Sequence, residues 1–284
     1  MEDFESRDEL AASIKAIYPD AELTFTADGT DVSKLVQEAI QRGSTLIIAG
    51  GGDGTVNAVA SAVAGTDVLL GVLPLGTLNH FCKDLGIPME LKAAIGNLGT
   101  GRAIAVDVAE VNGRIFVNNS GLGLYPTIVR LREARQARGQ TKWMAAAVAA
   151  IRALRHYQRL ALRVNASGRE LFRRTSIVFM GNNEYAIEGL NIGTRTQIDA
   201  GQLCLYITRE SSSLRLIRLT LSALMGKLQK NTDYDKILTD EVWIHSRHST
   251  LNVSIDGEVT RLASPLHYRI RPKALRVLVP DGEN

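Results

Sequence analysis

The chain has 284 residues, of which 45% are hydrophobic and 22% charged, and its formal net charge is +3. These values are typical of a globular protein with one large or two ordinary domains, and they exclude a strongly basic nucleic-acid-binding chain. Only two cysteines occur, Cys82 and Cys204, which excludes a disulfide-rich scaffold and favours a reducing compartment.

No stretch of the sequence predicts export or insertion into a membrane. The N-terminal segment MEDFESRDEL is acidic and has no apolar core, so we expect no signal peptide. The longest apolar run, residues 144–151, is far shorter than the roughly 20 residues that cross a bilayer. We therefore expect a cytoplasmic protein, at most peripheral at the inner face of the membrane.

The first third of the chain alternates helical and strand patterns. Helical spacing of apolar residues predicts helices at 6–18 and, after a capping Asp31, at 32–42. Alternation predicts a strand at 21–27, and apolar runs predict buried strands at 46–49 and 67–75. A helix rich in Ala and Val, closed by Gly65, lies between the last two. This order predicts an α/β domain at residues 1–105 with a Rossmann-like parallel sheet.

After residue 103 the pattern changes to short strands. One hairpin is predicted to turn at Asn112-Gly113 and a second near Gly168, and further short strands follow to the end of the chain. Two helices are expected within this part, at 142–157 and 214–228. We predict an antiparallel β-sandwich domain at residues 106–284.

A glycine-rich loop follows the strand at 46–49, in the stretch TLIIAGGGDGT. Gly50, Gly51, Gly52 and Gly54 let backbone N–H groups approach an anion, and the next helix directs the positive end of its dipole there. Asp53 beside a phosphate requires a divalent cation between them, which predicts a nucleotide with Mg²⁺. The alternative is a packing turn with Asp53 as helix N-cap. No Gly-Lys-Ser/Thr follows, so the loop is not a P-loop.

A second loop, LPLGTLNHFCKDLGIP at residues 73–88, leaves the next buried strand. It places Thr77 and Asn79 where the carboxyl ends of the strands gather, which is where open α/β sheets bind ligands. An ordinary turn with a capping Asn is the alternative reading. The glycine loop one strand earlier favours the functional one.

Three motifs, GGDGT at 51–55, LPLGTLNHFCKDLGIP and SIDGE at 254–258, together resemble the diacylglycerol kinase catalytic family, particularly the bacterial soluble lipid kinases related to sphingosine kinases. The resemblance covers nearly the whole chain. It implies a first domain like those of phosphofructokinases and NAD kinases. It also implies transfer of the ATP γ-phosphoryl group to a lipid hydroxyl such as that of diacylglycerol, with Mg²⁺ as cofactor and the nucleotide between the two domains.

The same resemblance assigns roles to individual residues. It implies Glu258 as proton acceptor, with Asp256 helping to position it, whereas the alternative for Asp256-Gly257 is a plain hairpin turn. It implies Asp53 and Asp107 as metal residues, Asp107 through a metal-bound water. The residues implied in nucleotide binding are Gly50, Gly51, Gly52, Asp53, Gly54, Thr55, Asn57, Gly76, Thr77 and Asn79.

Three features depart from the family pattern. Relatives begin with a strand and an Asn-Pro-x-Ser-Gly loop, and this chain starts at the helix that would follow, so we expect the first strand to be missing. His80 stands where many relatives carry Asp. Relatives can carry a structural Mg²⁺ site around an Asp-Gly pair. This chain has Asp199-Ala200-Gly201 instead, with the acidic residue one position earlier, so the sequence does not decide whether it has that site.

Two basic segments predict how the protein meets a lipid. A cationic strip runs from Arg130 to Arg159, and the pattern at 214–230 predicts a basic amphipathic helix. One interpretation is that these segments contact an anionic membrane surface. The other is that they are ordinary helices with one face toward the core and one toward solvent. We expect no nucleic-acid partner, and a homodimer stays open. The alternative functions are an NAD kinase-like or other GGDGT kinase, and a nucleotide- or lipid-binding module without catalysis.

Overall fold

The chain folds into two compact units, which the computed structural model describes for residues 7–27, 30–125, 159–188, 191–195, 197–208 and 234–281. The first unit comprises residues 1–108 and 272–284, and the second comprises residues 109–271. The boundary expected at 105/106 lies close to this division. Residues 272–284, however, were expected in the second domain and belong to the first unit.

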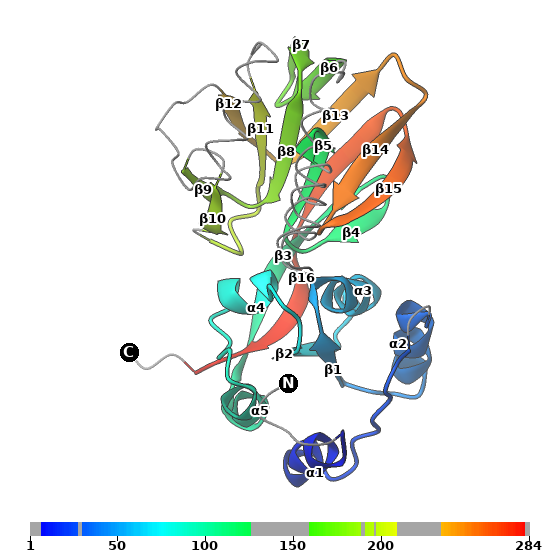
Figure 1. Ribbon diagram of the computed structural model, residues 1–284, viewed down its shortest axis with the longest axis vertical. Coiled ribbons are helices and arrows are strands. Elements are labelled where there is room, and N and C mark those ends of the chain that lie inside the picture. Colours follow the sequence, from blue (N-terminus) through cyan, green and yellow to red (C-terminus); the bar gives the residue numbers. More distant parts are fainter. Residues whose placement is uncertain are drawn as a thin grey trace, which may run out of the picture. The chain divides into compact units, whose positions relative to one another are not determined.

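Strand pairing explains this difference. The end of β16 (Leu266–Val279) pairs in parallel with β2 (Leu69–Pro74), with Arg276 opposite Leu69. In Figure 1 the red end of β16 accordingly lies beside β2. Such a pairing joins residues about 200 positions apart, and no local pattern in the sequence reports it.

The first unit is a parallel sheet with helices, as predicted. Its sheet has the order β1-β2-β16, and β1 pairs with β2 in the register Leu46 to Leu69. Its other elements are α1 (Arg7–Ile17), α2 (Val32–Gln41), β1 (Leu46–Gly51), α3 (Asp53–Val63), α4 (His80–Asp84), α5 (Leu91–Thr100) and the first part of β3 (Arg102–Val111).

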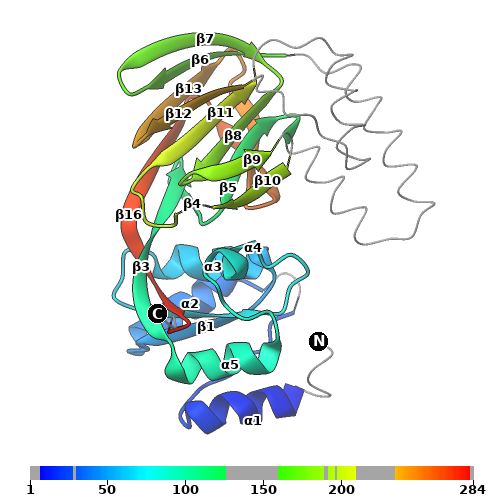
Figure 2. The same ribbon diagram turned by 90° about the vertical axis from the view of Figure 1, so that its left-hand side faces the viewer.

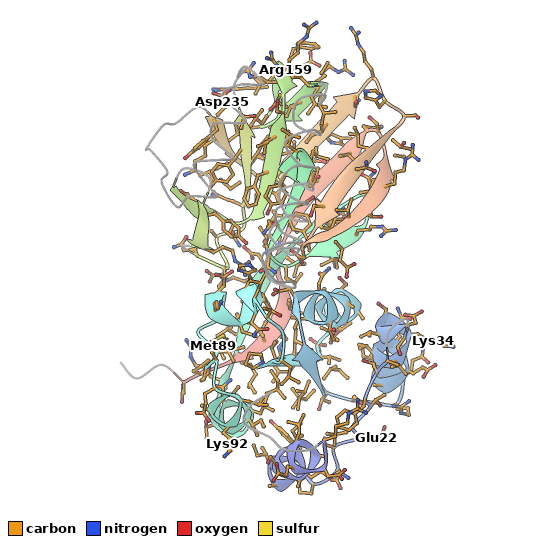
Figure 3. The ribbon with its side chains drawn as sticks, viewed as in Figure 1. Glu22, Lys34, Met89, Lys92, Arg159 and Asp235 are labelled. Carbon is orange, nitrogen blue, oxygen red and sulfur yellow. The ribbon has the colours of Figure 1, made fainter. Side chains whose placement is uncertain are left out.

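Burial in this unit follows the apolar pattern of the sequence. The central strand β2 buries Leu70, Val72 and Leu73, while α3 buries Val59 and Val63 at helical spacing. Lysines lie on the opposite sides of the helices: Figure 3 shows Lys34 of α2 and Lys92 of α5 on the outside of the unit. Each helix therefore presents one apolar face to the core.

Two local predictions for this unit have different outcomes. The cap of α2 is confirmed, because the Asp31 side chain accepts a hydrogen bond from Lys34 N–H at 3.0 Å. The strand expected at 21–27 is wrong, because these residues form no regular structure and are mostly exposed. An alternating sequence becomes a strand only when a neighbouring strand accepts its backbone hydrogen bonds, and β1 is the last strand of the sheet among the described residues.

The second unit contains two large antiparallel sheets, in agreement with the predicted sandwich, and a two-stranded antiparallel sheet of β9 and β10. One has the order β12-β11-β8-β5-β14-β15, and the other contains β4, β13, β6 and β7 with the beginning of β16. Figure 2 shows the strands of this unit from the side. The bounds are β4 Arg114–Phe116, β5 Asn119–Gly123, β6 Leu160–Ala166, β7 Arg169–Thr175, β8 Ile177–Asn182, β9 Tyr185–Glu188, β10 Asn191–Arg195, β11 Leu203–Thr208, β12 Tyr234–Thr239, β13 Glu241–Ser246, β14 Thr250–Ile255 and β15 Glu258–Ala263.

An apolar core lies between the two sheets. Val164 and Ile244 from one sheet and Met180, Leu205 and Val253 from the other belong to a single buried cluster. A smaller aromatic cluster contains Phe179 of β8 and Tyr206 of β11, whose side chains alternate with those of the main core, together with Tyr185 of β9. β8 is therefore covered on both faces, which explains why its apolar residues do not alternate with polar ones.

The hairpin turns occur where the sequence predicts them. Asn112 and Gly113 both have positive φ, 47° and 79°, as do Ser167 and Gly168, 50° and 71°. Two consecutive positive φ values are the requirement of a type I′ turn, for which Asn-Gly is the preferred pair.

The predicted helices at 142–157 and 214–228 lie outside the described residues, as does the cationic strip except for Arg159, which precedes β6 (Figure 3). Among the helices that the structure does describe, none combines the length and hydropathy required to cross a bilayer.

Candidate active site

The first candidate loop connects β1 to α3. β1 ends at Gly51, and Gly52 serves as the N-cap of α3 in extended conformation without any side-chain hydrogen bond to the helix. A helix N-terminus of this kind presents backbone amides and the positive end of the helix dipole to an anion. A Cβ on Gly51 would lie 2.7 Å from Cβ of Thr55, so the strand must pass the first turn of α3 without a side chain.

The second candidate loop follows β2 and is closed by Asn79. This residue has positive φ, 49°, its Oδ1 accepts from Gly76 N–H at 3.0 Å, and its Nδ2 donates to the carbonyls of Gly76 and Pro74. Three hydrogen bonds from one buried side chain fix the shape of residues 74–79. Asn79 therefore holds the loop, and Thr77 is left exposed at its tip.

The two loops touch at a pair of glycines. A Cβ on Gly76 would lie 2.4 Å from Cα of Gly52, closer than any real contact. Gly51 and Pro74 are partners in the register of β1 and β2, so both loops leave the same edge of the parallel sheet. The structure thus brings together the two glycine loops that the sequence predicts to be neighbours.

Asp53 ties the loops through a hydrogen bond. Its Oδ1 accepts from the backbone N–H of His80, the first residue of α4, at 2.9 Å. Asp53 is the first residue of α3, and the helix terminus that its carboxylate caps is that of α4 rather than its own. The residue expected to meet a cation also has a structural task, and the half-buried carboxylate remains at the surface of the loop.

Other implied nucleotide residues lie in the same segment. Thr55 and Asn57 belong to the first turns of α3, and Asn57 Oδ1 accepts a hydrogen bond from the Ser61 hydroxyl at 3.4 Å.

Burial, and next the charge of Asp53, raise the pKa of the Cys82 thiol to about 12. Cys82 is therefore a neutral core side chain rather than a nucleophile.

Asp107 lies in β3 and is 1% exposed. Its Oδ1 accepts from Lys273 N–H at 2.8 Å, and Lys273 has a positive φ of 52° in β16. The hydrogen bond fixes β3 to an irregular point of β16. No group of three or more His, Cys, Asp or Glu side chains suited to a metal occurs among the described residues.

Of the two implied metal residues, Asp53 fits Mg²⁺ better. Mg²⁺ in nucleotide sites is held by one or two carboxylates together with phosphate oxygens and water. A half-buried carboxylate beside a helix N-terminus suits that arrangement, whereas the buried Asp107 is directed at a backbone amide. A metal role for Asp107 stays a prediction.

In the second unit, Asp256 occupies the turn between β14 and β15 with a positive φ of 44°. Its carboxylate accepts three backbone hydrogen bonds, from Val117 at 2.8 Å, Asn118 at 2.9 Å and Asn119 at 2.8 Å. These residues connect β4 to β5. The turn is more than a hairpin connection, because its acidic side chain organises a second segment of the chain.

Two opposing effects determine the pKa of Asp256. Burial raises the pKa, the amides of Val117, Asn119 and Asn118 and the positive charge of Arg195 lower it, and the net value is about 6, above the ordinary 3.8. The carboxylate is therefore mostly ionised at pH 7 although it is enclosed by protein.

Glu258 begins β15 opposite Ile255, two residues after Asp256, and is exposed. Asp256 faces inward and Glu258 lies at the surface of the same turn. This is the arrangement expected if Glu258 contacts a substrate and Asp256 holds the turn.

Several polar residues around this turn were not singled out in the sequence. Asn118, Asn182 and Arg195 are buried, and they surround the β4–β5 connection through hydrogen bonds from Asn182 and Arg195 to Val117. The doublets Asn118-Asn119 and Asn182-Asn183 at strand ends are a local signal that could have marked the first two. Arg195 has no such signal, because its partner is 78 positions away.

Two domain families match the chain. Residues 5–111 match the diacylglycerol kinase catalytic domain, and residues 128–279 match the YegS C-terminal NAD kinase beta sandwich-like domain. Together they cover both units of the structure.

Relatives match the chain over most of its length. The chain is 28% identical over 272 residues to a probable lipid kinase YegS-like protein of Pseudomonas fluorescens, covering 92% of this chain and 86% of the relative. It is also 28% identical over 257 residues to the probable lipid kinase YegS of Escherichia coli, covering 88% and 83%.

Solved structures establish the likeness of the fold. A structure of a diacylglycerol kinase from Bacillus anthracis superposes with a TM-score of 0.68 at 20% identity, and the superposition covers 95% of this chain and 88% of that chain. Another from the same organism reaches a TM-score of 0.75 at 22% identity, covering 96% and 91%.

Proposed function

Because this chain belongs to the YegS-like lipid kinase family with a diacylglycerol kinase catalytic domain, we propose that it transfers the γ-phosphoryl group of ATP to a lipid hydroxyl such as that of diacylglycerol. The observation that carries the proposal is the pair of loops after β1 and β2, which meet at Gly52 and Gly76 and are tied by Asp53. Phosphoryl transfer depends chiefly on positioning and charge neutralisation, and a rigid cradle of backbone amides suits both tasks.

The nucleotide is assigned to the first unit. The amides at the start of α3 would receive phosphate oxygens, and Asn79 keeps the second loop in the shape that the cradle needs. Asp53 would hold Mg²⁺, which supplies positive charge to the phosphates when bound. The backbone amides would then bind the phosphate oxygens of the nucleotide, while the carboxylate of Asp53 would bind its Mg²⁺.

Proton transfer is assigned to the second unit. Glu258 accepts the proton of the lipid hydroxyl, because it is exposed and stands on a fixed turn. Asp256 positions that turn through its three amide hydrogen bonds and does not itself reach the substrate. The two carboxylates thus have separate tasks set by their burial.

The proposal includes a cytoplasmic enzyme that meets its acceptor at the inner face of the membrane. Two observations support this part of the proposal: the lipid kinase family to which the chain belongs, and the basic residues in segments 130–159 and 214–230 of the sequence. Flotation with vesicles with and without anionic lipid tests it: equal binding to both would discard electrostatic docking. A homodimer remains part of the proposal, to be measured by light scattering.

The decisive experiment incubates the purified chain with radiolabelled ATP, Mg²⁺ and diacylglycerol in mixed micelles and separates the lipid products. We expect phosphatidic acid that depends on both Mg²⁺ and the lipid. ATP binding without transfer to diacylglycerol or other lipid alcohols would support a binding module instead, and phosphorylation of NAD would support the NAD kinase alternative.

Asp53→Asn sharpens this experiment. Asparagine keeps the oxygen that accepts from His80 N–H but removes the charge that binds a cation, so we expect an unchanged melting temperature and a loss of transfer of at least about 100-fold. Asp67→Asn, an exposed loop residue, is the matched control and should keep full activity. Equal activity of the two variants would remove Asp53 from the metal site.

A further inference from the structure

A single peptide group connects two buried charges in the second unit. The carbonyl of Val117 accepts from Arg195 Nη1 at 2.7 Å and from Asn182 Nδ2 at 2.9 Å. The N–H of the same peptide, that of Asn118, donates to Asp256 Oδ1 at 2.9 Å. Because C=O and N–H point in opposite directions in a trans peptide, the guanidinium and the carboxylate lie on opposite sides of it.

This arrangement is an ion pair transmitted through a peptide. A cation at the carbonyl oxygen polarises the amide, and the polarised N–H becomes a stronger donor to an anion. Asp256 and Arg195 are 9% and 8% exposed, so each would be costly to bury without an opposite charge nearby. The peptide between Val117 and Asn118 lets them compensate each other.

Arg195 is held in place by its own surroundings. It ends β10, and its guanidinium carbon lies 6.0 Å from the centre of the Tyr185 ring in β9. Tyr185 in turn packs edge-on against Phe179 of the aromatic cluster, with ring centres 5.5 Å apart. The position of the charge is therefore set by packing as well as by the hydrogen bond to Val117.

Among the described residues, the hydrogen-bond partners of the Asp256 carboxylate are neutral backbone amides. The β4–β5 connection contributes three amides, and the neighbouring Ser120 and Tyr268 hydroxyls are hydrogen-bonded to each other at 3.1 Å. On its own turn, Glu258 is exposed. Arg195 is the charged side chain there that acts on the ionisation of Asp256.

We propose that Arg195 is a positioning residue, which keeps Asp256 ionised through the Val117–Asn118 peptide and thereby fixes the turn that carries Glu258. Its part in catalysis rests on the proposed function, whereas its effect on Asp256 does not. No contact between Arg195 and the reacting groups is required. The consequence is a dependence on pH that a purely structural arginine would not produce.

The first experiment measures the titration of Asp256 by NMR of its labelled carboxyl carbon in the full chain. In Arg195→Met we expect the midpoint to rise from about 6 by about one unit, because an opposite charge has been removed. Arg195→Lys retains the charge and should stay near the wild-type value. Arg163→Met, which removes an exposed arginine paired with Glu170, is the matched control and should leave the midpoint unchanged.

An identical midpoint in wild type and a folded Arg195→Met would overturn the proposal. If that variant does not fold at pH 8, it must fold at pH 5, where Asp256 is protonated and no uncompensated charge remains in the core. A variant unfolded at both values would show that Arg195 has only a packing role, and would equally overturn the proposal.

The second experiment records lipid phosphorylation against pH. We expect the acid limb of kcat/KM to move upward by the same one unit in Arg195→Met and to stay in place in Arg195→Lys. A uniform loss at every pH would contradict the positioning role. If the wild type has no kinase activity, the proposed function fails while the titration of Asp256 still decides the role of Arg195.

Discussion

Glu258 is the residue whose replacement most directly tests the chemistry. Glu258→Gln removes the proton acceptor from an exposed position, so we expect transfer to fall by about 100- to 10,000-fold while stability changes by less than about 0.5 kcal/mol. ATP affinity should be retained, because the nucleotide is assigned to the first unit. Glu170→Gln, an exposed glutamate of β7, is the control for charge and should be fully active. Full activity of Glu258→Gln would refute the base assignment.

Asp256 predicts a measurable dependence of stability on pH. Its folded pKa of about 6 exceeds its ordinary value of 3.8, so between these values the folded state holds a proton that the unfolded state releases. The stabilisation from this bound proton is fully present below pH 4 and is lost as pH rises through 6. For a pKa difference of about two units, the free energy of unfolding falls by about 3 kcal/mol. Urea unfolding of wild type and Asp256→Asn across pH 4 to 7.5 measures it as the change in their difference. A difference independent of pH would contradict the raised pKa.

At the scale of elements, the contact between the two loops predicts a severe effect of one methyl group. Gly76→Ala would place Cβ 2.4 Å from backbone Cα of Gly52, so the loops must separate. We expect a destabilisation of about 1–3 kcal/mol and loss of ATP binding, measured by urea unfolding and calorimetric titration.

A second glycine provides the control for that substitution. Gly96 lies inside α5, and a Cβ there meets nothing within 4 Å. Gly96→Ala should therefore stabilise the protein by up to about 1 kcal/mol through helix propensity. If Gly76→Ala bound ATP as well as Gly96→Ala, the closeness of the loops would have no part in nucleotide binding.

The accuracy of sequence-based expectation depended on how local each feature is. The Asn112-Gly113 turn and the Asp31 cap were predictable, because the required φ values and hydrogen bonds involve residues within a few positions. The prediction of a strand at 21–27 was wrong, because a strand forms only where another strand, distant in sequence, pairs with it. The setting of Asp256 was only half predictable: its turn follows from Asp-Gly, but its amide partners are 137 to 139 positions away.

For the whole molecule, the pairing of β16 makes the second unit an insertion within the first. Residues 272–281 supply the parallel neighbour of β2 and bury Leu275 and Val277, and the Ala274 carbonyl accepts from Gly65 N–H at 2.7 Å. A fragment that ends at residue 108 lacks all of these contacts and leaves one edge of the central strand uncovered. We therefore predict that residues 1–108 alone do not fold.

The structure also indicates how to restore such a fragment. The hydrogen bond from Lys273 N–H to Asp107 places residues 108 and 272 side by side, so a flexible linker of about five residues should join them without strain. The linked fragment, residues 1–108 followed by 272–281, should unfold cooperatively in urea and bind ATP. The same fragment with Val277→Asp, which places a charge at a fully buried position of β16, should remain unfolded. Cooperative folding of residues 1–108 without the final strand would show that β2 does not need its second neighbour.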